Sequence, residues 1–469
     1  MTAMTASEQL RHRLESLLAR LEDGLIERRR EVRLILLAAL AGEHSLLLGP
    51  PGTAKSELAR RLHRAFAEAR YFERLLTRFS VPEELFGPLS IRALEDDRYE
   101  RHTAGFLPEA SIAFIDEVFK ANSAILNALL TLLNEREFDN GAGRIHCPLI
   151  SAIGASNEVP DDEVAAAFFD RFLLRIPVSP VSGEGFRALL ALPPLDADAT
   201  VFDGALGATE REALRRRADH VALPAAVADR MVELRDWLIA HDIAVSDRRW
   251  VKVAGLMRTA AASDGRDALS PWDLMLLPAC LGSDGAEQQR VCDWLTTRLG
   301  VREASTPPRL ERVVAAFEGQ LLAERNADDL DYDEDGRLRM TDAQIAGEVN
   351  DMKGGSQALR MTYTRKRRYG DTHIGARTGQ LDDLLARIGG YRDELAEVRH
   401  DFARYRDASL WLDRPLADAI DANLATIAIA LDDFAVRTRG CRAGFEALPR
   451  LPDDPGIAPE PVACEPLLE

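Results

Sequence analysis

The sequence predicts an α/β protein with an αβα core on a mostly parallel sheet, then an all-α lid, then a C-terminal helical domain carrying a small insert. Three observations lead to this prediction. Strand-like apolar runs alternate with helix-like segments between residues 45 and 178, which is typical of a parallel sheet covered on both faces. Residues 205–300 have helical periodicity throughout. After residue 300, apolar residues recur at alternating steps of three and four, as they do in packed long helices.

The predicted core occupies residues 1–190 and the predicted lid residues 205–300. Residues 7–41 have the apolar spacing of helices. The strand SLLLG then leads into a loop and the helix KSELARRLHRAFAEA, whose apolar residues form one stripe. The strand IAFID, the helix NSAILNALLTLLNE and the strands PLISAIGAS and FLLRIPV follow. A Pro- and Asp-rich stretch at 179–204 marks the boundary between core and lid.

The C-terminal third contains three apolar stripes with heptad spacing, which predict a triple-helical or coiled-coil domain over residues 305–448. The stripes are Leu310, Val313, Phe317 and Leu321; Leu381, Leu384, Ile388, Tyr391, Leu395, Val398, Phe402 and Tyr405; and Leu416, Ile420, Leu424, Ile427, Leu431, Phe434, Thr438, Cys441 and Phe445. A polar insert at about 326–377 separates the first stripe from the second. The Pro- and acid-rich tail, 450–469, is expected to be disordered.

Composition counts against several classes of protein. The net charge of -18 counts against non-specific binding to nucleic acid, which needs a surplus of Lys and Arg. The five cysteines are scattered and odd in number, which favours a reducing cytosol over a disulfide framework or zinc site. The N-terminus lacks the apolar core of a signal peptide, and the longest apolar run, LILLAALA, is too short to span a bilayer. We therefore expect a cytoplasmic protein with no membrane span.

The segment GPPGTAKS fits the phosphate-binding loop G-x-x-x-x-G-K-[ST] with one departure. Its residues are Gly49, Pro50, Pro51, Gly52, Thr53, Ala54, Lys55 and Ser56. The backbone N–H groups and the helix N-terminus would hold phosphates, Lys55 would reach the β- and γ-phosphates, and Ser56 would bind Mg²⁺. The departure is Ala54 in place of glycine, which adds one methyl group and suits the first turn of the following helix.

Polar residues follow two of the later strands. Asp116 and Glu117 end the strand IAFID, where Asp116 suits a Mg²⁺ shell and Glu117 suits activation of a water. Asn157 follows the strand PLISAIGAS and is placed to hold that water or the γ-phosphate. A charge pair at a helix start is the alternative for the acids, and a turn before Pro160 is the alternative for Asn157.

Arg171, in AFFDRFLLRIP, ends a predicted helix just before a strand. An arginine presented there to the nucleotide of a neighbouring subunit stabilises the charge of the transition state. A surface ion pair with Asp170 is the alternative.

In order along the chain, GPPGTAKS, FIDE, GASN and FFDRF resemble the Walker A, Walker B, sensor 1 and arginine-finger motifs of an AAA+ ATPase core. The stretch RFSVPEELFGPLSIRALEDDRYERHTAGFLPEASIAFIDE resembles the MoxR family, and together with SDRRW it is most similar to the regulatory ATPase variant A (RavA) branch. The resemblance covers about residues 10–300 and extends only in outline beyond them. It implies ATP and Mg²⁺ as cofactors, and the roles given above for the named residues.

The resemblance implies further features. Arg248 in SDRRW matches sensor 2, a nucleotide-contacting arginine, with Arg249 as the alternative. Residues 90–108 would supply an insertion in the second core helix and residues 138–149 a hairpin before sensor 1, both facing the pore of a hexameric ring. Members of the family are expected to remodel proteins in a chaperone-like way, paired with von Willebrand factor A (VWA) domain proteins.

Two motifs in the insert allow alternatives. The segment DYDEDGRLRMTD approaches a Ca²⁺-binding EF-hand loop, with Asp331, Asp333, Asp335 and Asp342 as ligands, although the last position usually carries Glu. An acidic surface turn is the alternative. The segment YTRKRRYG mixes basic and aromatic residues as a nucleic-acid surface does, but in so acidic a chain a solvated loop or a protein contact is favoured.

Three hypotheses of function follow. The first is an ATP-hydrolysing ring that remodels protein clients. The second is a DNA-acting motor with the same helix insertion, against which the charge balance counts. The third is a non-hydrolysing, nucleotide-gated scaffold, against which the presence of Glu117, Asn157 and Arg171 together counts.

Overall fold

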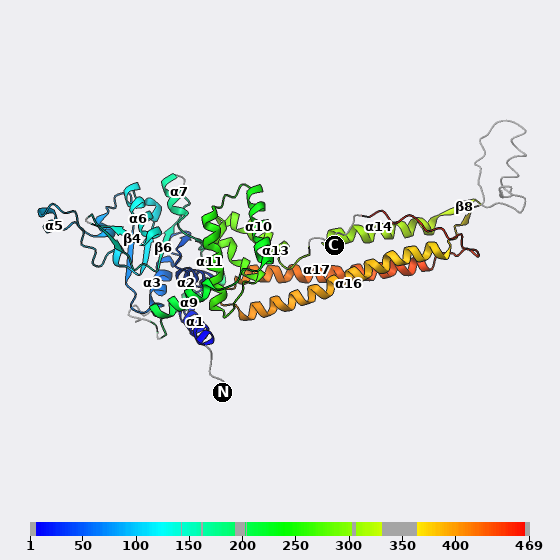
Figure 1. The fold of residues 1–469 in the computed structure, drawn as a ribbon, viewed down its shortest axis with the longest axis horizontal. Helices are drawn as coiled ribbons and strands as arrows, with labels where there is room; N and C mark the ends of the chain where they lie inside the picture. Colours follow the sequence, from blue (N-terminus) through cyan, green and yellow to red (C-terminus); the bar gives the residue numbers. More distant parts are fainter. Residues whose placement is uncertain are drawn as a thin grey trace, which may run out of the picture. The chain divides into compact units, whose positions relative to one another are not determined.

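The computed structural model describes residues 6–141, 143–160, 163–192, 202, 204–302, 306–330 and 364–464. The chain forms two compact units, which are described separately. The first contains Met1–Leu299 with Ala403–Ala419, and the second contains Gly300–Phe402 with Ile420–Glu469. Figure 1 shows the elements of both units along the chain.

The core of the first unit is a parallel sheet with the strand order β2-β3-β6-β1-β7. Its strands are β1 (Ser45–Leu48), β2 (Tyr71–Leu75), β3 (Ile112–Asp116), β6 (Ser151–Ser156) and β7 (Leu174–Pro177). The strands are short apolar runs that are almost entirely buried in β1, β3, β6 and β7. Burial on both faces is what a parallel sheet covered by helices requires.

Helices cover both faces of this sheet, as the predicted fold class requires. Ala113 and Ile115 of β3 pack in one apolar cluster with α6 (Ser123–Glu135) and α7 (Glu163–Phe169). Alternate residues of a strand face opposite sides, and α3 (Lys55–Arg64) packs on β3 outside that cluster. The remaining core helices are α1 (Ala6–Glu22), α2 (Arg29–Leu40), α4 (Glu83–Phe86), α5 (Ile91–Glu95) and α8 (Gly183–Leu190). The prediction of an α/β core is confirmed.

Helix α3 is shorter than predicted. It ends at Arg64, although the apolar stripe continues to Ala69. Phe66 instead forms a β-bridge with Leu206, and Ala67 N–H donates to the Leu206 carbonyl at 3.1 Å. A pairing partner distant in sequence therefore ends the helix.

The segment between helix α6 and strand β6 contains the expected hairpin. Its strands, β4 (Glu137–Asp139) and β5 (Arg144–His146), pair antiparallel. The expected insertion contains the short helix α5, and a β-bridge joins its Arg101 to Leu89, the residue just before it.

The lid of the first unit is helical, as predicted. It consists of α9 (Ala208–Asp219), α10 (Ala225–Ala240), α11 (Asp247–Ser263), the 3₁₀ helix η3 (Pro271–Leu276), α12 (Leu277–Leu281) and α13 (Gly285–Arg298). Helix α11 packs against α9 and α2, which joins the lid to the core.

The turn near residue 410 belongs to the first unit, although its sequence pattern assigned it to the C-terminal domain. Trp411 Nε1–H donates to Ser263 Oγ at 2.7 Å, and the Leu410 N–H donates to Asp264 Oδ1 at 3.0 Å. Arg30 forms an ion pair with Asp413 at 2.7 Å. These contacts are not visible in a heptad pattern, which reports only the spacing of apolar residues.

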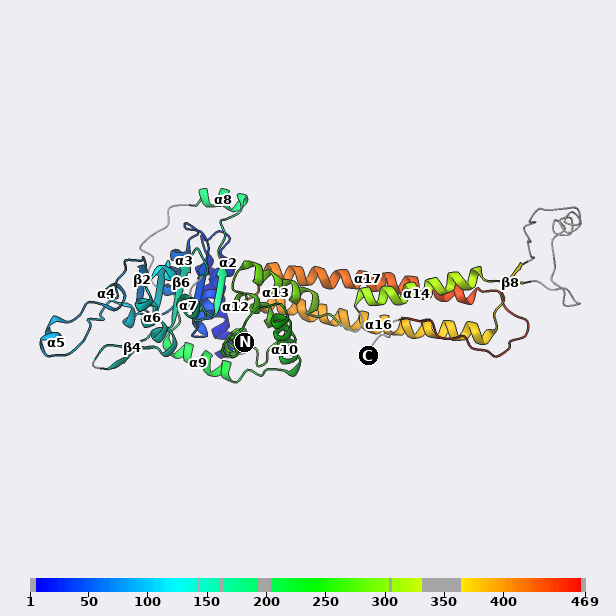
Figure 2. The same cartoon turned by 90° about the horizontal axis from the view of Figure 1, so that it is seen from above.

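The second unit is built from three long helices, α14 (Pro307–Asn326), α16 (Asp371–Ala408) and α17 (Arg414–Glu446), of which α16 and α17 continue into the first unit (Figure 2). Most predicted stripe residues are buried, including all nine of the last stripe; Leu321, Val398 and Tyr405 are half-buried. Ion pairs join Arg437 of α17 to Glu311 and Glu318 of α14. The prediction of long C-terminal helices is confirmed.

The ends of the predicted insert pair with each other through β8 (Asp328–Leu330) and β9 (Thr364–Lys366). The candidate Ca²⁺ ligands, which all lie within 331–342, fall outside the described residues.

The first part of the tail, for which we expected disorder, makes specific contacts. The Thr372 N–H and hydroxyl donate to Asp454 Oδ2 at 2.7 and 2.6 Å, and Arg377 Nη1 donates to the Glu460 carbonyl at 2.7 Å. Hydrogen bonds to long-range partners therefore fix a segment whose composition alone indicated disorder. No helix within the described ranges is long and apolar enough to cross a membrane.

Candidate functional site

The phosphate-binding loop connects β1 to α3 at the carboxyl edge of the sheet. The Gly49 N–H donates to the Ser156 carbonyl at 3.0 Å, which ties the loop to β6. A Cβ atom at Gly49 would lie 2.1 Å from the Val178 carbonyl oxygen, so only glycine fits there. Gly52 has φ +80°, the left-handed region that favours glycine. The two glycines are thus required by the backbone of the loop.

Ala54 differs from our expectation. We expected it in the first turn of the helix, but it is the N-cap of α3 with φ 66° and ψ 22°, a left-handed conformation. For a residue with a Cβ atom this conformation costs about 1–2 kcal/mol. The position therefore keeps the backbone geometry that glycine provides in the common form of the motif, at a local cost.

Lys55 folds back over its own loop. Its Nζ donates to the carbonyl oxygens of Gly49 and Pro50 at 2.7 and 2.9 Å, and Thr53 Oγ1 also donates to the Pro50 carbonyl at 2.9 Å. Pro50 and Pro51 lie on the exposed side of the loop. The ammonium group is therefore positioned where phosphate oxygens would replace carbonyls as its acceptors.

The acidic pair lies beside this lysine. Burial lowers the pKa of Lys55, and the nearby carboxylates of Asp116 and Glu117 partly offset that effect. Burial likewise raises the pKa of Asp116, whereas the Glu117 N–H, which donates to Asp116 Oδ1 at 3.0 Å, and Lys55 lower it. Glu117 is in a left-handed conformation, φ 52°, and pairs with Lys120 at 3.2 Å. The lysine and both acids are thus brought together.

Asn157 follows β6 directly and is exposed. Strand β6 lies between β1 and β3, with Leu48 paired to Ser156 and Ile115 to Gly154. Because the strands are parallel, the carboxyl ends of β1, β3 and β6 meet at one edge. The structure therefore places Asn157 at the same edge as the phosphate-binding loop and the acidic pair.

The residues expected to hold Mg²⁺ have suitable chemistry. Ser56 lies in the first turn of α3, and both its hydroxyl and the Asp116 carboxylate are half-exposed at the same edge. Mg²⁺ prefers such hard oxygen ligands and usually keeps waters and phosphates as its other ligands. Across the described ranges there is no group of three or more His, Cys, Asp or Glu residues able to hold a metal. A site of one hydroxyl and one carboxylate does not require such a group.

Arg28 supports the loop and was missed in the sequence. Its side chain is buried, and its Nε and Nη2 donate to the carbonyl oxygens of Thr53 and Ser179 at 3.3 and 2.6 Å. It stands in the run ERRRE, which contains no motif that separates it from its neighbours.

The predicted arginine finger lies at the opposite edge of the sheet. Arg171 is in the turn between α7 and β7, at the amino end of β7. Two residues later, the Leu173 N–H donates to the carbonyl of His44, which precedes β1. Amino and carboxyl ends of β1 are separated by four residues, or about 13 Å. Arg171 therefore lies away from the phosphate-binding loop of its own chain.

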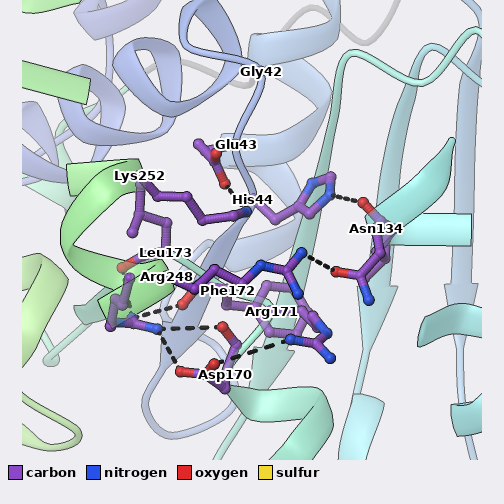
Figure 3. A network of polar contacts seen from close by, with 12 residues as sticks. Gly42, Glu43, His44, Asn134, Asp170, Arg171, Phe172, Leu173, Arg248 and Lys252 are labelled. Atoms are coloured by element: carbon purple, nitrogen blue, oxygen red, sulfur yellow. Dashed lines mark hydrogen bonds and ion pairs between the residues drawn. The ribbon is translucent and has the colours of Figure 1, made fainter. Parts of the chain in front are cut away.

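Arg248 lies close to Arg171 (Figure 3). These two arginines line a small pocket together with Asp170, Arg249 and Lys252. Arg248 is exposed, and its Nη2 donates to Asn134 Oδ1 at 3.0 Å.

Arg249, the alternative to Arg248, is buried and fully engaged. Its Nε donates to the Cys280 carbonyl, its Nη1 to Asp170 Oδ1 at 3.1 Å, and its Nη2 to the carbonyls of Phe172 and Leu173, each at 2.8 Å. It thereby connects lid helix α11 to the turn that carries Arg171. Arg248, in contrast, is exposed, with its hydrogen bond to Asn134 as described above.

Arg171 has unused hydrogen-bonding capacity. Its Nε is buried without a hydrogen-bond partner, and the Asp170 carboxylate is 4.0 Å away. Burial lowers the pKa of Arg171, and the positive charge of Arg248 lowers it further. Two cations held this close favour an anion between them.

The core is a five-stranded parallel αβα fold with a phosphate-binding loop, and acidic and amide side chains lie at its carboxyl edge. Together with the helical lid, these features define an AAA ATPase. Within this class the chain belongs to the MoxR family: residues 12–198 match the family described as the MoxR domain in the MoxR-vWA-beta-propeller ternary systems. Residues 226–295 match the AAA lid domain. Membership in this family indicates an ATP-binding ATPase.

Individual relatives agree with this assignment. The chain is 41% identical over 271 residues to the uncharacterized protein MJ0079 of Methanocaldococcus jannaschii, covering 57% of this chain and 70% of that protein. It is 28% identical over 195 residues to the protein MoxR of Paracoccus denitrificans, covering 40% of this chain and 57% of that protein. A solved structure of a putative ATPase from Cytophaga hutchinsonii matches with a TM-score of 0.50 and 16% identity, covering 61% of this chain and 91% of that one, which shows the shared fold alone.

Proposed function

We propose that this chain forms an ATP-hydrolysing MoxR-type ring that remodels protein clients together with a VWA-domain partner. The observation that carries the proposal is the division of the site between two edges of one sheet. The loop, the acids and Asn157 lie at the carboxyl edge, whereas Arg171 and Arg248 lie at the amino edge. A complete site then needs two copies of the chain.

Within one copy, Lys55 would bind the β- and γ-phosphates, and Ser56 and Asp116 would hold Mg²⁺. Bound Mg²⁺ would neutralise phosphate charge. Glu117 accepts a proton from the attacking water, and Asn157 orients that water. Burial raises the pKa of Asp116, and a bound cation would favour its carboxylate form.

The second copy contributes Arg171 and Arg248 to the γ-phosphate. The buried, unpartnered Nε of Arg171 and the charge repulsion between the two guanidinium groups support this role. Such an arginine is worth on the order of 10³-fold or more in turnover.

The description of the matched family supports the proposal of a VWA-domain partner. It names a vWA component and a β-propeller component beside the MoxR domain. A hexameric ring and membership in the RavA branch rest on the sequence resemblance and stay predictions, as does the cytoplasmic location.

Mixing two inactive variants tests the shared site. Lys55→Ala loses nucleotide binding but keeps its arginines, and Arg171→Ala binds nucleotide but lacks the finger. Neither hydrolyses ATP alone, and we expect a mixture to recover activity at sites where the two variants meet. The double variant Lys55→Ala/Arg171→Ala is the control, because it lacks both the lysine that binds nucleotide and the arginine given to the neighbouring copy. A mixture that stays inactive although the two variants co-assemble would contradict sharing.

A further inference from the structure

A cavity of about 680 Å³ lies in the first unit, at the amino ends of β1 and β6. Three parts of the chain form its wall: the loop before β1, the segment between α6 and β6, and helix α9. The phosphate-binding loop follows the carboxyl end of β1, so the cavity is separate from the nucleotide site. Small-molecule sites usually have volumes of roughly 300–1,000 Å³, a range that includes this cavity.

Arg211 of α9 brings an unsatisfied donor to the cavity wall. Its Nε is buried without a hydrogen-bond partner. Its guanidinium carbon lies 5.5 Å from the centroid of the Phe66 ring, a contact that favours one orientation of the group. Burial lowers the pKa of Arg211, and no carboxylate among the described residues offsets that effect. A buried donor without an acceptor destabilises a protein, and a bound anion would supply the missing acceptor.

Two further arginines line the same cavity. Arg215 is exposed and lies four residues after Arg211, so the two side chains share one face of α9. Arg136 is fixed in the wall, because its Nη2 donates to the Gly42 carbonyl at 2.7 Å and to the Ile150 carbonyl at 3.3 Å. Two separate parts of the chain therefore bring cations to one space.

The two carboxylates of the lining have other cations as partners. Glu43 Oε2 accepts from Lys252 Nζ at 2.5 Å, and the Glu212 carboxylate lies 4.0 Å from Arg216. Neither of these partners is among the residues that line the cavity. The three lining arginines are therefore in excess over the acids available to them, and such an excess of positive charge favours an anion.

Apolar side chains complete the lining. Leu40 and Leu149 are 7% and 6% exposed, and both contribute to the wall together with Pro148. An inorganic anion would leave this apolar surface uncovered, whereas an organic anion would remove part of it from water. Guanidinium groups bind carboxylates and phosphates through paired N–H donors. The lining thus combines groups for an oxyanion with a surface for a carbon skeleton.

We propose that this cavity binds a small organic oxyanion, a carboxylate or a phosphate joined to a compact apolar group. Arg211 and Arg215 bind the oxyanion, and Leu40 and Leu149 contact the apolar group. The Nε of Arg211 then has the acceptor that it lacks in the empty cavity. The site is additional to the nucleotide site and does not depend on the ATPase function proposed above.

Two probes with the same ring, benzoate and phenyl phosphate, test the site and distinguish the two oxyanions. Titration calorimetry in a Lys55→Ala background keeps the phosphate-binding loop from competing for phenyl phosphate. At least one probe should bind with a Kd on the order of 1 mM or below, as expected for ligands of this size. The tighter probe identifies the class of oxyanion. Benzamide, which has the ring without the charge, should bind at least about tenfold more weakly.

Variants of the lining locate the binding. Arg211→Met and Arg215→Met should each weaken the tighter probe by at least about tenfold. Arg215 is exposed, so its variant should keep the melting temperature of the background even if Arg211→Met does not. The matched control is Arg230→Met on α10, which removes an arginine that pairs with Glu233 outside the cavity and should leave binding unchanged.

Three results would overturn the proposal. The first is that neither anion binds at concentrations up to about 10 mM. The second is that benzamide binds as tightly as the anions, because the charge would then have no role. The third is that Arg215→Met binds the tighter probe as well as the Arg230→Met control does, whatever the outcome for Arg211→Met.

Discussion

Arg249 holds the carboxylate of Asp170 at 3.1 Å, directly beside Arg171. The same guanidinium also binds the carbonyls of Phe172 and Leu173, the two residues that follow Arg171. Because Arg249 lies in the first turn of lid helix α11, these hydrogen bonds tie the lid to the turn that carries Arg171. Its sequence neighbour Arg248 is exposed and donates instead to Asn134 Oδ1.

Arg249→Met should destabilise the protein by roughly 3 kcal/mol or more, because it leaves buried carbonyls and a carboxylate without their donor. Chemical denaturation, followed through the unfolding of the first unit, measures this loss of free energy. Arg248→Met is the matched control and should change stability by no more than about 0.5 kcal/mol, as exposed residues do. Equal losses in the two variants would contradict the distinction between them.

Arg248→Ala should lower kcat with little change in KM, because we place this side chain at the transition-state charge of a neighbouring nucleotide. A decrease on the order of a thousandfold or more is expected, as for such arginines in general. Steady-state ATPase assays under assembling conditions give both constants. A raised KM at unchanged kcat would instead indicate a role in ground-state binding.

Glu117→Gln should bind ATP and fail to turn it over, because the amide cannot accept the proton of the attacking water. Binding measured with a fluorescent ATP analogue should match the wild type within a few fold, whereas Lys55→Ala should bind much more weakly. Turnover that persists in Glu117→Gln would remove Glu117 from this role.

Ala54→Gly should stabilise the protein by about 0.5–1 kcal/mol. Glycine removes the strain of the left-handed conformation at φ 66°, partly offset by the greater freedom of glycine in the unfolded chain. Denaturation of the nucleotide-free protein measures the change. Ala59→Gly, in the middle of α3, is the control and should be destabilising by about 1 kcal/mol.

Asp264 should make stability depend on pH. Burial is the main cause that raises its pKa from 3.8 to about 6, with Asp273 adding to it and Leu410 N–H and Arg266 opposing it. A carboxyl with a raised native pKa binds its proton more tightly when folded. The contribution of Asp264 to the free energy of unfolding is therefore fully present below pH 4 and is lost as the pH rises through about 6. The total loss is roughly 3 kcal/mol.

Asp264→Asn tests this, because the amide oxygen can still accept from the Leu410 N–H but does not titrate. The difference in unfolding free energy between variant and wild type should change between pH 4 and pH 6.5 in favour of the variant. A difference that stays constant over this range would assign the pH dependence to other groups.

The sequence by itself determined the fold class and the half of the site at the carboxyl edge. Strand–helix alternation fixed a parallel sheet, and in such a sheet the ends of strands meet at one edge, so Lys55, Asp116, Glu117 and Asn157 could be grouped without coordinates. Heptad spacing likewise placed the buried faces of α14, α16 and α17. These features are local or periodic, and so they can be read from one chain.

Only the tertiary structure decided which of two adjacent arginines is buried and which is exposed. Nothing in the sequence distinguishes Arg248 from Arg249. They differ in burial because consecutive residues of helix α11 point in different directions, and Arg249 points toward the carbonyls of Phe172 and Leu173. The same holds for Arg28, whose partners in the loop and after β7 are distant in sequence. It also holds for Ala54, because its left-handed φ is set by how the loop joins β1 to α3 and not by the residue type. Long-range hydrogen bonds and backbone geometry have no periodic signature, and the structure was needed to reveal them.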